Sequence, residues 1–419
     1  MGPLICNYFS RGGFSVSELT FGIIGLGQRG LSYGRLLTQE LSQAGRVMAL
    51  ADINGKRMHG AAALLGLTNV ALYGDYHDLL VDPNIDAVVV TTPDFTHEIV
   101  ATDALKAGKH VLCEKPLATT VAGCHKIMEA QAADQVLQVG FVLRYNRVYE
   151  IAYQIMARGD IGRIQQIIAT DNRQGADYFR RWHRFREKSG GLFNHKSTHT
   201  FDIINWYADA SPLRVSALGG LGVYVPGQWQ GERCLNCPWQ AQCPEYLDLR
   251  EEPYQSLYLQ AEAVDGYIRD TCVFTSRKDT VDHGHALIEF DNGVQASYNL
   301  SLFAPIDTRQ MMIFGDAGKL ELDEATRRIT VNARHSQDIM EYRVAKDVGG
   351  HGGGDGGLMR EFIGCIQHGN QPLAGAPAGA WSCLVSLAAE RSVADQRPIT
   401  IAEMLQDAGI PEGFPATTS

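Results

Sequence analysis

Two histidines stand four residues apart in the segment GGLFNHKSTHTFDIINW, residues 190–206. If a helix starts here, this spacing places the imidazoles of His195 and His199 on one face. Two such imidazoles can hold a metal ion or carry protons. A metal site needs a third ligand, and the neighbouring sequence has no glutamate of the H-E-x-x-H type. We therefore interpret both histidines as proton carriers and substrate contacts.

A lysine follows a short apolar stretch in KHVLCEKP, residues 109–116. If this stretch is a parallel strand, Lys115 lies at its carboxyl end, where ligands bind in doubly wound sheets. Pro116 disfavours the α conformation at Lys115 and keeps that residue extended. Desolvation at such a site lowers the pKa of an ammonium group toward a useful range. We predict an acid-base role for Lys115; the alternative is a solvated surface lysine.

A glycine pattern precedes these residues. Gly25, Gly27 and Gly30 match G-x-G-x-x-G, with an apolar strand before them and a helical pattern after them. Asp52 ends the next apolar run, GRVMALAD, at the distance where dinucleotide-binding folds have the carboxylate for the adenosine ribose. The pyrophosphate is expected at the helix N-terminus.

The carboxylate of Asp52 predicts NAD rather than NADP, because it would repel a 2′-phosphate. Lys56 and Arg57 follow closely and weaken this preference. The alternative interpretation is a β-turn-α unit with incidental glycines.

Strands and helices alternate through the first third of the chain, which is typical of a parallel sheet covered on both faces. We expect a doubly wound, Rossmann domain at residues 18–145. Strand patterns such as RIQQIIATDN and LRVSALGGLGVY then predict an antiparallel sheet with flanking helices at residues 146–419. The turn DNG between HALIEF and VQASYNLSLF predicts a hairpin.

The motifs GIIGLGQRG, TTPDFTH, GKHVLCEKP and GG followed by HKSTHTFD resemble those of the Gfo/Idh/MocA oxidoreductases, and the likeness extends over nearly the whole chain. It is strongest to a bacterial branch acting on sugars and glycosides. The resemblance implies an α/β fold: an N-terminal Rossmann domain and a C-terminal α/β domain with a large open antiparallel sheet. It also implies that NAD is held by Gly25, Gly27, Gln28, Arg29, Gly30, Asp52, Thr92, Pro93, His97, Glu114, Lys115 and Arg144.

The family's pattern has an aspartate and, four residues later, a histidine that works with the lysine. His199 matches that histidine, whereas His195 stands at the aspartate position. The resemblance thus implies a catalytic set of Lys115, His195 and His199. Asp202 follows and could orient His199 or cap the helix.

The segment YFRRWHRFREK, residues 178–188, is rich in arginine and aromatic residues. The resemblance implies that Tyr178, Arg181 and Trp182 contact the substrate, together with His195 and His199. Its charge could attract an anionic sugar; the alternative is a solvated amphipathic turn. A glycine-rich segment, residues 349–362, is expected to be a mobile loop that brings His351 and Asp355 toward the sugar; the alternative is a second phosphate cradle.

A cysteine cluster lies in RCLNCPWQAQC, within a predicted insertion near residues 230–275. Cys234, Cys237 and Cys243, with Cys272 as fourth ligand, predict a closed structural zinc site. His283 or His285 is the alternative fourth ligand. Core cysteines or a disulfide are the other interpretations.

The chain has 419 residues, 45% of them hydrophobic, and a net charge of −10. This acidic balance argues against nucleic-acid and membrane-surface partners. Nine scattered cysteines and an N-terminus without a secretory pattern predict a cytoplasmic protein. The resemblance implies a homodimer or homotetramer that pairs through the open sheet.

The sequence is compatible with three functions. The first is NAD-dependent oxidation of a hydroxyl on a sugar or sugar derivative. The second is a redox-neutral glycosidase that oxidises, eliminates, adds water and reduces, on a glycoside that could be anionic. The third is a non-catalytic sugar or NAD sensor, against which the presence of Lys115 and His199 argues.

Overall fold

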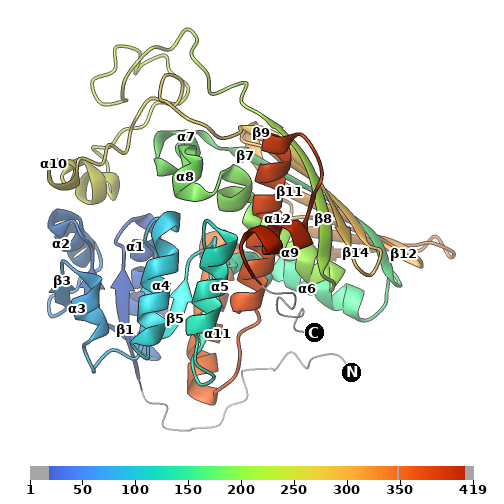
Figure 1. The fold of residues 1–419 in the computed structure, drawn as a ribbon, viewed down its shortest axis with the longest axis horizontal. Helices are drawn as coiled ribbons and strands as arrows, with labels where there is room; N and C mark the ends of the chain where they lie inside the picture. Colours follow the sequence, from blue (N-terminus) through green and yellow to red (C-terminus); the bar gives the residue numbers. More distant parts are fainter. Residues whose placement is uncertain (1–17, 347–348, 411–419) are drawn as a thin grey trace.

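A computed structural model describes residues 18–346 and 349–410. Two sheets organise these residues, one in each half of the chain (Figure 1). Residues 1–17, in which the sequence shows no secretory pattern, lie outside the described residues.

The first sheet has six parallel strands in the order β3-β2-β1-β4-β5-β6. Strands β2 and β3 follow on one side of β1, and strands β4, β5 and β6 follow on its other side. This is the doubly wound order that the alternation predicted. The strands are β1 (Leu19–Ile24), β2 (Gly45–Ala51), β3 (Ala71–Tyr73), β4 (Ala87–Val90), β5 (His110–Cys113) and β6 (Leu137–Val139).

Helices connect these strands, because parallel strands need crossover connections. They are α1 (Gln28–Arg35) with the π-helix η1 (Leu36–Glu40), α2 (Gly55–Leu64), α3 (Tyr76–Leu80), η2 (Asp94–Thr96), α4 (His97–Lys106) and α5 (Val121–Ala130). Side-chain caps by Asn54, Asp75 and Thr120 begin α2, α3 and α5.

The second sheet has nine strands in the order β14-β13-β12-β11-β7-β10-β9-β8-β15. They are β7 (Ile164–Gln174), β8 (Pro212–Gly220), β9 (His283–Phe290), β10 (Gln295–Ser301), β11 (Phe303–Gly315), β12 (Gly318–Asp323), β13 (Arg328–Ala333), β14 (Ile339–Arg343) and β15 (Ile399–Thr400). The predicted antiparallel pairing is observed except between β7 and β10, which are parallel, so the sheet is mixed. The DNG hairpin joins β9 to β10 as predicted.

Helices cover one face of this sheet. Those that contact its strands are α6 (Arg147–Ala157), α9 (Thr198–Ala208), α12 (Ala376–Asp395) and α13 (Ile401–Asp407). Other helical segments that follow β6 are η3 (Val142–Tyr145), α7 (Ala176–Arg180), η4 (Trp182–Arg184), α8 (Arg186–Ser189), the π-helix η5 (Phe193–Ser197), η7 (Gly350–Gly353) and α11 (Gly354–His368). The outer face carries exposed apolar side chains, including Leu218, Leu287 and Met312.

An insertion separates β8 from β9 and contains the cysteine cluster. Its regular elements are the π-helix η6 (Gln255–Leu259) and α10 (Glu262–Asp265). In Figure 1 it extends across the top of the molecule and brings α10 above α2.

Two late helices bind the halves of the chain together. Phe362 of α11 is fully buried in the core of the first sheet, with its ring 6.3 Å from that of Phe21. Helix α12, for which the sequence analysis made no prediction, contacts α5 of the first half and β8 and α9 of the second. Shared hydrophobic packing therefore joins the two halves.

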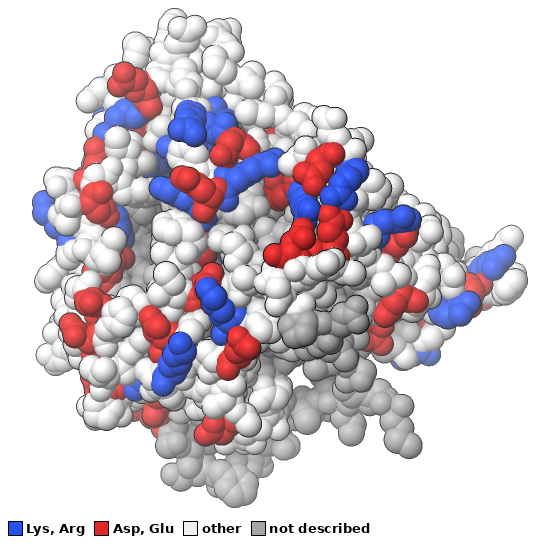
Figure 2. Space-filling view, viewed as in Figure 1, with Lys and Arg blue, Asp and Glu red and all other residues white. Residues whose placement is uncertain are grey.

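Basic and acidic side chains are interspersed over the face drawn in Figure 2. Surface ion pairs such as Arg391 with Asp407, at 2.6 Å, bring opposite charges together. Within the described ranges, none of the helices combines the length and the apolar composition that crossing a bilayer requires.

Candidate active site

The glycine turn lies between β1 and α1, and its geometry requires glycine at two positions. Gly25 has φ +91°, which L side chains rarely adopt, and a Cβ at Gly30 would overlap the carbonyl oxygen of Gly25. The backbone of the turn thus packs closely against the start of α1. This leaves the N-terminal amides of α1 at the edge of the sheet, where a dinucleotide pyrophosphate binds.

Asp52 follows β2 directly and reaches the glycine turn. Its carboxylate accepts hydrogen bonds from the Leu26 and Asn54 amides, at 2.8 and 2.9 Å. The guanidinium of Arg57 lies 3.1 Å from the same carboxylate. The predicted ribose-binding carboxylate is therefore at the expected edge, with a cation beside it.

Arg29 and Glu114 form an ion pair at the same edge. Arg29 Nε donates to Glu114 at 2.7 Å, and Arg29 also pairs with Asp355 at 3.0 Å. Arg29 lowers the pKa of Glu114 against the opposing effect of burial, so this carboxylate stays charged. Asp355 lies in the glycine-rich segment, which forms η7 and the start of α11 instead of the expected loop and reaches the cofactor edge through Arg29.

The segment after β4 carries Thr92, Pro93 and His97. Both ring nitrogens of His97 lie near carbonyl oxygens, those of Pro116 at 2.7 Å and Thr92 at 2.9 Å. The hydroxyl of Thr92 is buried and has no hydrogen-bond partner within the described part of the chain. Such an orphaned group fits a site that a ligand completes.

These features fit a bound dinucleotide. The glycine turn leaves room for a close approach, the α1 amides can bind phosphate oxygens, and the Asp52 carboxylate lies at the end of β2. When bound, the nicotinamide would supply the hydride acceptor or donor.

Arg144 has a different set of contacts. Its guanidinium forms two bonds to the buried carboxylate of Asp202, at 2.7 and 2.8 Å, and one to the Leu373 carbonyl. Asp202 therefore pairs with Arg144 and neither orients His199 nor caps the helix. The assignment of Arg144 to the cofactor stays a prediction.

Lys115 lies at the carboxyl end of β5 and faces the second half of the chain. Its ammonium donates to the carbonyl oxygen of His195 at 2.8 Å. Burial lowers the pKa of Lys115, and this effect outweighs the charges of Asp94 and Glu114, which raise it. A lysine whose pKa is lowered gives up its proton more readily than a free lysine.

His195 and His199 do not continue a single α-helix. His195 lies in the π-helix η5, whereas His199 lies in the first turn of α9. Because a π-helix winds more loosely than an α-helix, the two rings have different neighbours. His199 lies 6.3 Å from the ring of Phe141 and 6.3 Å from that of His351.

Asp94 supplies a carboxylate to His195. His195 Nδ1 lies 2.6 Å from Asp94 Oδ2, and both side chains are buried. Burial raises the pKa of Asp94 and lowers that of His195, so it disfavours the charged form of each group. The sequence analysis missed Asp94 because it is 101 residues from His195.

His199 is held as a neutral imidazole. Burial lowers its pKa well below the usual value, and the charges of Lys115 and Lys196 lower it further. Its Nδ1 is buried and lacks a partner among the described residues. A neutral imidazole with an unbound nitrogen can accept a proton.

The aromatic segment surrounds His195. The rings of Tyr178 and Trp182 each lie 5.5 Å from that of His195, and the ring of His183 lies 3.8 Å from it at a tilt of 38°. Arg181 Nε is buried without a partner in the part of the chain described here. The segment is largely packed against other residues and is not a solvated turn, and it also brings in His183, which the sequence analysis missed.

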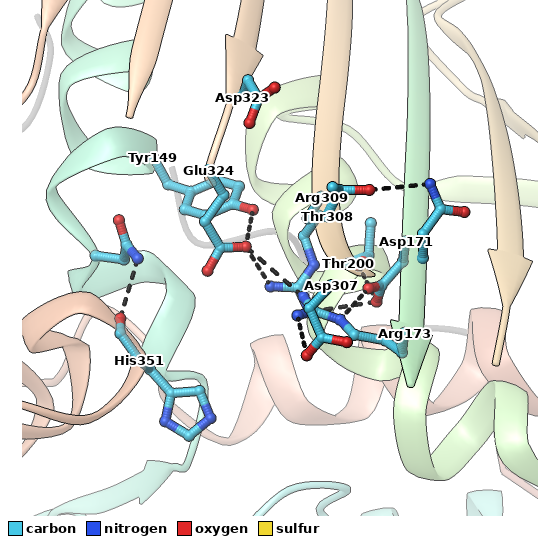
Figure 3. A network of polar contacts seen from close by, with 12 residues as sticks. Tyr149, Asp171, Arg173, Thr200, Asp307, Thr308, Arg309, Asp323, Glu324 and His351 are labelled. Atoms are coloured by element: carbon cyan, nitrogen blue, oxygen red, sulfur yellow. Dashed lines mark hydrogen bonds and ion pairs between the residues drawn. The ribbon is translucent and has the colours of Figure 1, made fainter. Parts of the chain in front are cut away.

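Figure 3 shows a network of charges on the inner face of the second sheet. Asp171 binds Lys196 at 2.8 Å, Arg173 at 2.6 Å and Arg309 at 3.2 Å. Burial lowers the pKa of Lys196 to about 7 even though Asp171 opposes this shift. A cavity of about 260 Å³ lies beside the network, lined in part by Arg173, Arg309 and Glu324.

The four predicted zinc ligands line one small cavity, and all four thiols are free. Within the described residues, no group of three or more His, Cys, Asp and Glu side chains is arranged to hold a metal ion. His283 and His285 instead lie near Asp282 and Asn299, at 2.7 and 2.6 Å. The structure thus does not support a preformed zinc site, and the alternative histidine ligands lie elsewhere.

Related proteins match both halves. YteT of Bacillus subtilis (strain 168), described as an oxidoreductase, is 32% identical over 358 residues, covering 77% of this chain and 82% of YteT. Inositol 2-dehydrogenase of Klebsiella pneumoniae is 40% identical over 147 residues, covering 35% of this chain and 43% of that protein. Levoglucosan dehydrogenase in complex with NADH has a similar fold, with TM-score 0.72 and 20% identity over 92% of this chain and 99% of that one.

The family models agree with this likeness. One, described as an oxidoreductase family with an NAD-binding Rossmann fold, matches residues 19–141. The other, the C-terminal alpha/beta domain of the same family, matches residues 154–401. The chain therefore belongs to the Gfo/Idh/MocA family of NAD-binding oxidoreductases, as its motifs predicted.

Proposed function

We propose that the protein is an NAD-dependent dehydrogenase that acts on a hydroxyl of a sugar or sugar derivative. The observation that carries this proposal is the meeting of Lys115 and the two histidines at the carboxyl edge of the NAD-binding sheet. The names of the inositol and levoglucosan dehydrogenases support a polyol or sugar as substrate.

In this mechanism the chain binds the sugar and moves a proton. Lys115 or His199 accepts the proton of the hydroxyl, because burial lowers the pKa of both groups and so favours their neutral forms. Tyr178 and Trp182 flank His195 and offer apolar surfaces to a sugar ring. Arg181 offers a buried, unpartnered donor to a substrate oxygen.

One observation favours a second candidate, the redox-neutral glycosidase. The bond to Asp94 uses Nδ1 of His195, so Nε2 is the nitrogen that can exchange a proton with a substrate. Once a glycoside is oxidised at C3, this imidazole could remove the acidified C2 proton and allow the C1 substituent to leave. Water addition and reduction then complete hydrolysis. A non-catalytic sensor would have no use for this carboxylate-imidazole pair.

We also propose zinc at the cysteine cluster. The gathering of four free thiols around one cavity supports it, because thiolates are preferred zinc ligands. The cluster then fixes an insertion that has little regular structure of its own.

We further propose a cytoplasmic homodimer or homotetramer. The eight cysteines in the described ranges are all free, which agrees with a reducing compartment. Exposed Leu218, Leu287 and Met312 on the outer sheet face support pairing through that face.

Loss of the acid-base groups should stop turnover. We expect Lys115→Ala and His199→Ala each to lower kcat by about 10²–10⁴-fold, the usual contribution of a positioned proton-transfer group. NADH affinity, measured by fluorescence, should change little. Lys106→Ala, which alters an exposed lysine at the end of α4, is the control. Near-normal kcat in either site variant would remove that residue from the mechanism.

The pH profile gives an independent measurement. A protonated lysine cannot accept the hydroxyl proton, so the oxidation rate should rise as pH passes the Lys115 pKa. Burial lowers this pKa, so the rise should occur below the pH at which a free lysine titrates. Lys115→Ala should abolish this limb of the profile.

The protein should bind NADH more tightly than NADPH. Asp52→Ala should reduce the ratio of the NADPH and NADH dissociation constants by about tenfold. The reason is that Arg57, 3.1 Å from the lost carboxylate, becomes available to a 2′-phosphate. Parallel fluorescence titrations measure both affinities, and Asp78→Ala, an exposed change, is the control. Equal affinities in the wild type would contradict the assignment of Asp52.

Protein purified without added metal should contain about one zinc per chain. Elemental analysis measures the zinc, and thiol titration counts the accessible cysteines. Cys237→Ser should lose the metal, whereas Cys365→Ser, in α11, should retain it. A zinc-free wild type with four reactive thiols in the cluster would refute the site.

A panel of aryl glycosides, including anionic ones, distinguishes the two activities. A dehydrogenase accumulates NADH together with a keto-sugar and releases little phenol, which is the result we expect. A redox-neutral glycosidase releases phenol without net NADH and, in D₂O, gives a product with deuterium at C2. Phenol release without C2 deuterium would rule out elimination.

A further inference from the structure

The insertion between β8 and β9 reaches the cofactor site of the other domain. Residues 254–270, which we call the strap, contain η6 and α10 and lie over α2 (Figure 1). Leu257 and Tyr258 are buried in the hydrophobic core of the first domain. The strap is therefore part of the wall around the dinucleotide.

The hydroxyl of Tyr258 is at the phosphate-binding end of α1. It accepts a hydrogen bond from the Gln28 amide at 3.2 Å. A Cβ at Gly27 would lie 3.3 Å from the same hydroxyl oxygen, so the tyrosine packs tightly against the glycine turn. Gln28 is the first residue of α1, and amides at this position bind anionic oxygens. The tyrosine hydroxyl thus lies beside an amide that is suited to bind the pyrophosphate.

Three further bonds attach the strap to the adenosine side of the site. Asn54 Nδ2 donates to the Ala261 carbonyl at 2.9 Å, and Arg57 Nε donates to the Leu257 carbonyl at 3.0 Å. Arg57 also pairs with Asp265 at 2.7 Å. Since Arg57 contacts Asp52 as well, one guanidinium joins the strap to the predicted ribose carboxylate.

The other end of the strap is anchored on the substrate side. Arg269 is fully buried, with its guanidinium 5.5 Å from the centre of the Tyr258 ring and 5.6 Å from that of Tyr254. It donates to Asp177 at 2.8 Å, and Asp177 lies in α7 directly before Tyr178. Arg269 is thus a positioning residue for Tyr258.

We propose that the strap retains the dinucleotide on the enzyme, and that Tyr258 is its contact to the pyrophosphate. With the cofactor bound, the Gln28 amide and the Tyr258 hydroxyl both donate to phosphate oxygens, since a phenol can donate as well as accept. A segment that must detach before a ligand leaves slows dissociation. This inference rests on NAD binding and is independent of the substrate assignment.

The test is the release rate of NADH. Protein loaded with NADH is mixed with excess NAD, and the loss of bound-NADH fluorescence is followed in a stopped-flow instrument. Tyr258→Phe removes one charge-assisted hydrogen bond and should accelerate release by about tenfold, with association changed less than threefold. Asp265→Asn, which weakens the bond to Arg57, should also accelerate release. Tyr246→Phe, a matched change elsewhere in the insertion, should leave the rate unchanged.

The competing outcomes are distinct. Unchanged release in both variants overturns the proposal. Faster association with unchanged release also overturns it, because the tyrosine would then block entry rather than retain the cofactor. If Tyr258→Phe proves unstable in thermal unfolding, Asp265→Asn decides alone. Hydrogen exchange of residues 254–270 in the wild type should slow when NADH binds, and no change would contradict the strap.

Discussion

The hydrogen bond from Lys115 to the carbonyl oxygen of His195 joins the two domains at the point where chemistry is expected. Burying an ammonium is costly unless hydrogen-bond acceptors and negative charges surround it. Here the His195 carbonyl accepts its hydrogen bond, and the carboxylates of Asp94 and Glu114 supply negative charge. Because the partner is a backbone atom of η5, the position of the lysine fixes the position of the histidine segment. Any change in the angle between the domains would break this bond, so their packing is part of the site.

The packing that preserves this angle comes from residues distant in sequence. The buried pair of Arg144 with Asp202 joins the end of the first domain to α9, α12 packs on both halves, and α11 packs on the first. Arg144 also binds the Leu373 carbonyl just before α12. Breaking a buried ion pair leaves an uncompensated charge, which is strongly destabilising. The fold thus uses specific polar contacts as well as apolar burial to orient the domains.

The sequence predicted those features that local chemistry determines. The glycine turn, Asp52 at the end of β2, the strand alternation and the DNG hairpin all follow from short segments with strong conformational preferences. The parallel β7–β10 pair, by contrast, depends on strands more than 120 positions apart along the chain, and no local pattern encodes that register. The π-helix η5 likewise depends on tertiary contacts that override the α-helical spacing of His195 and His199.

The same limit applies to the site. Asp94, His183 and Tyr258 have no motif of their own, and each gains its role from a partner that only the fold brings near. Asp94 is the aspartate of TTPDFTH, shortly after β4. Nothing in that motif predicts that it contacts His195. A search of the sequence for a carboxylate near the unusual histidine could have proposed Asp94 only as one of many.

The electrostatics of the site serve two requirements at once. The pKa of His199 is lowered first by burial and then by the charges of Lys115, Lys196 and Arg309, which makes the imidazole a neutral acceptor. The same cations surround the base of the proposed mechanism, and preorganised positive charge would stabilise an alkoxide that develops there. Asp171 neutralises part of this charge by pairing with Lys196 and Arg309. The cations lower the pKa of His199, and the pairing with Asp171 avoids burying an excess of uncompensated positive charge.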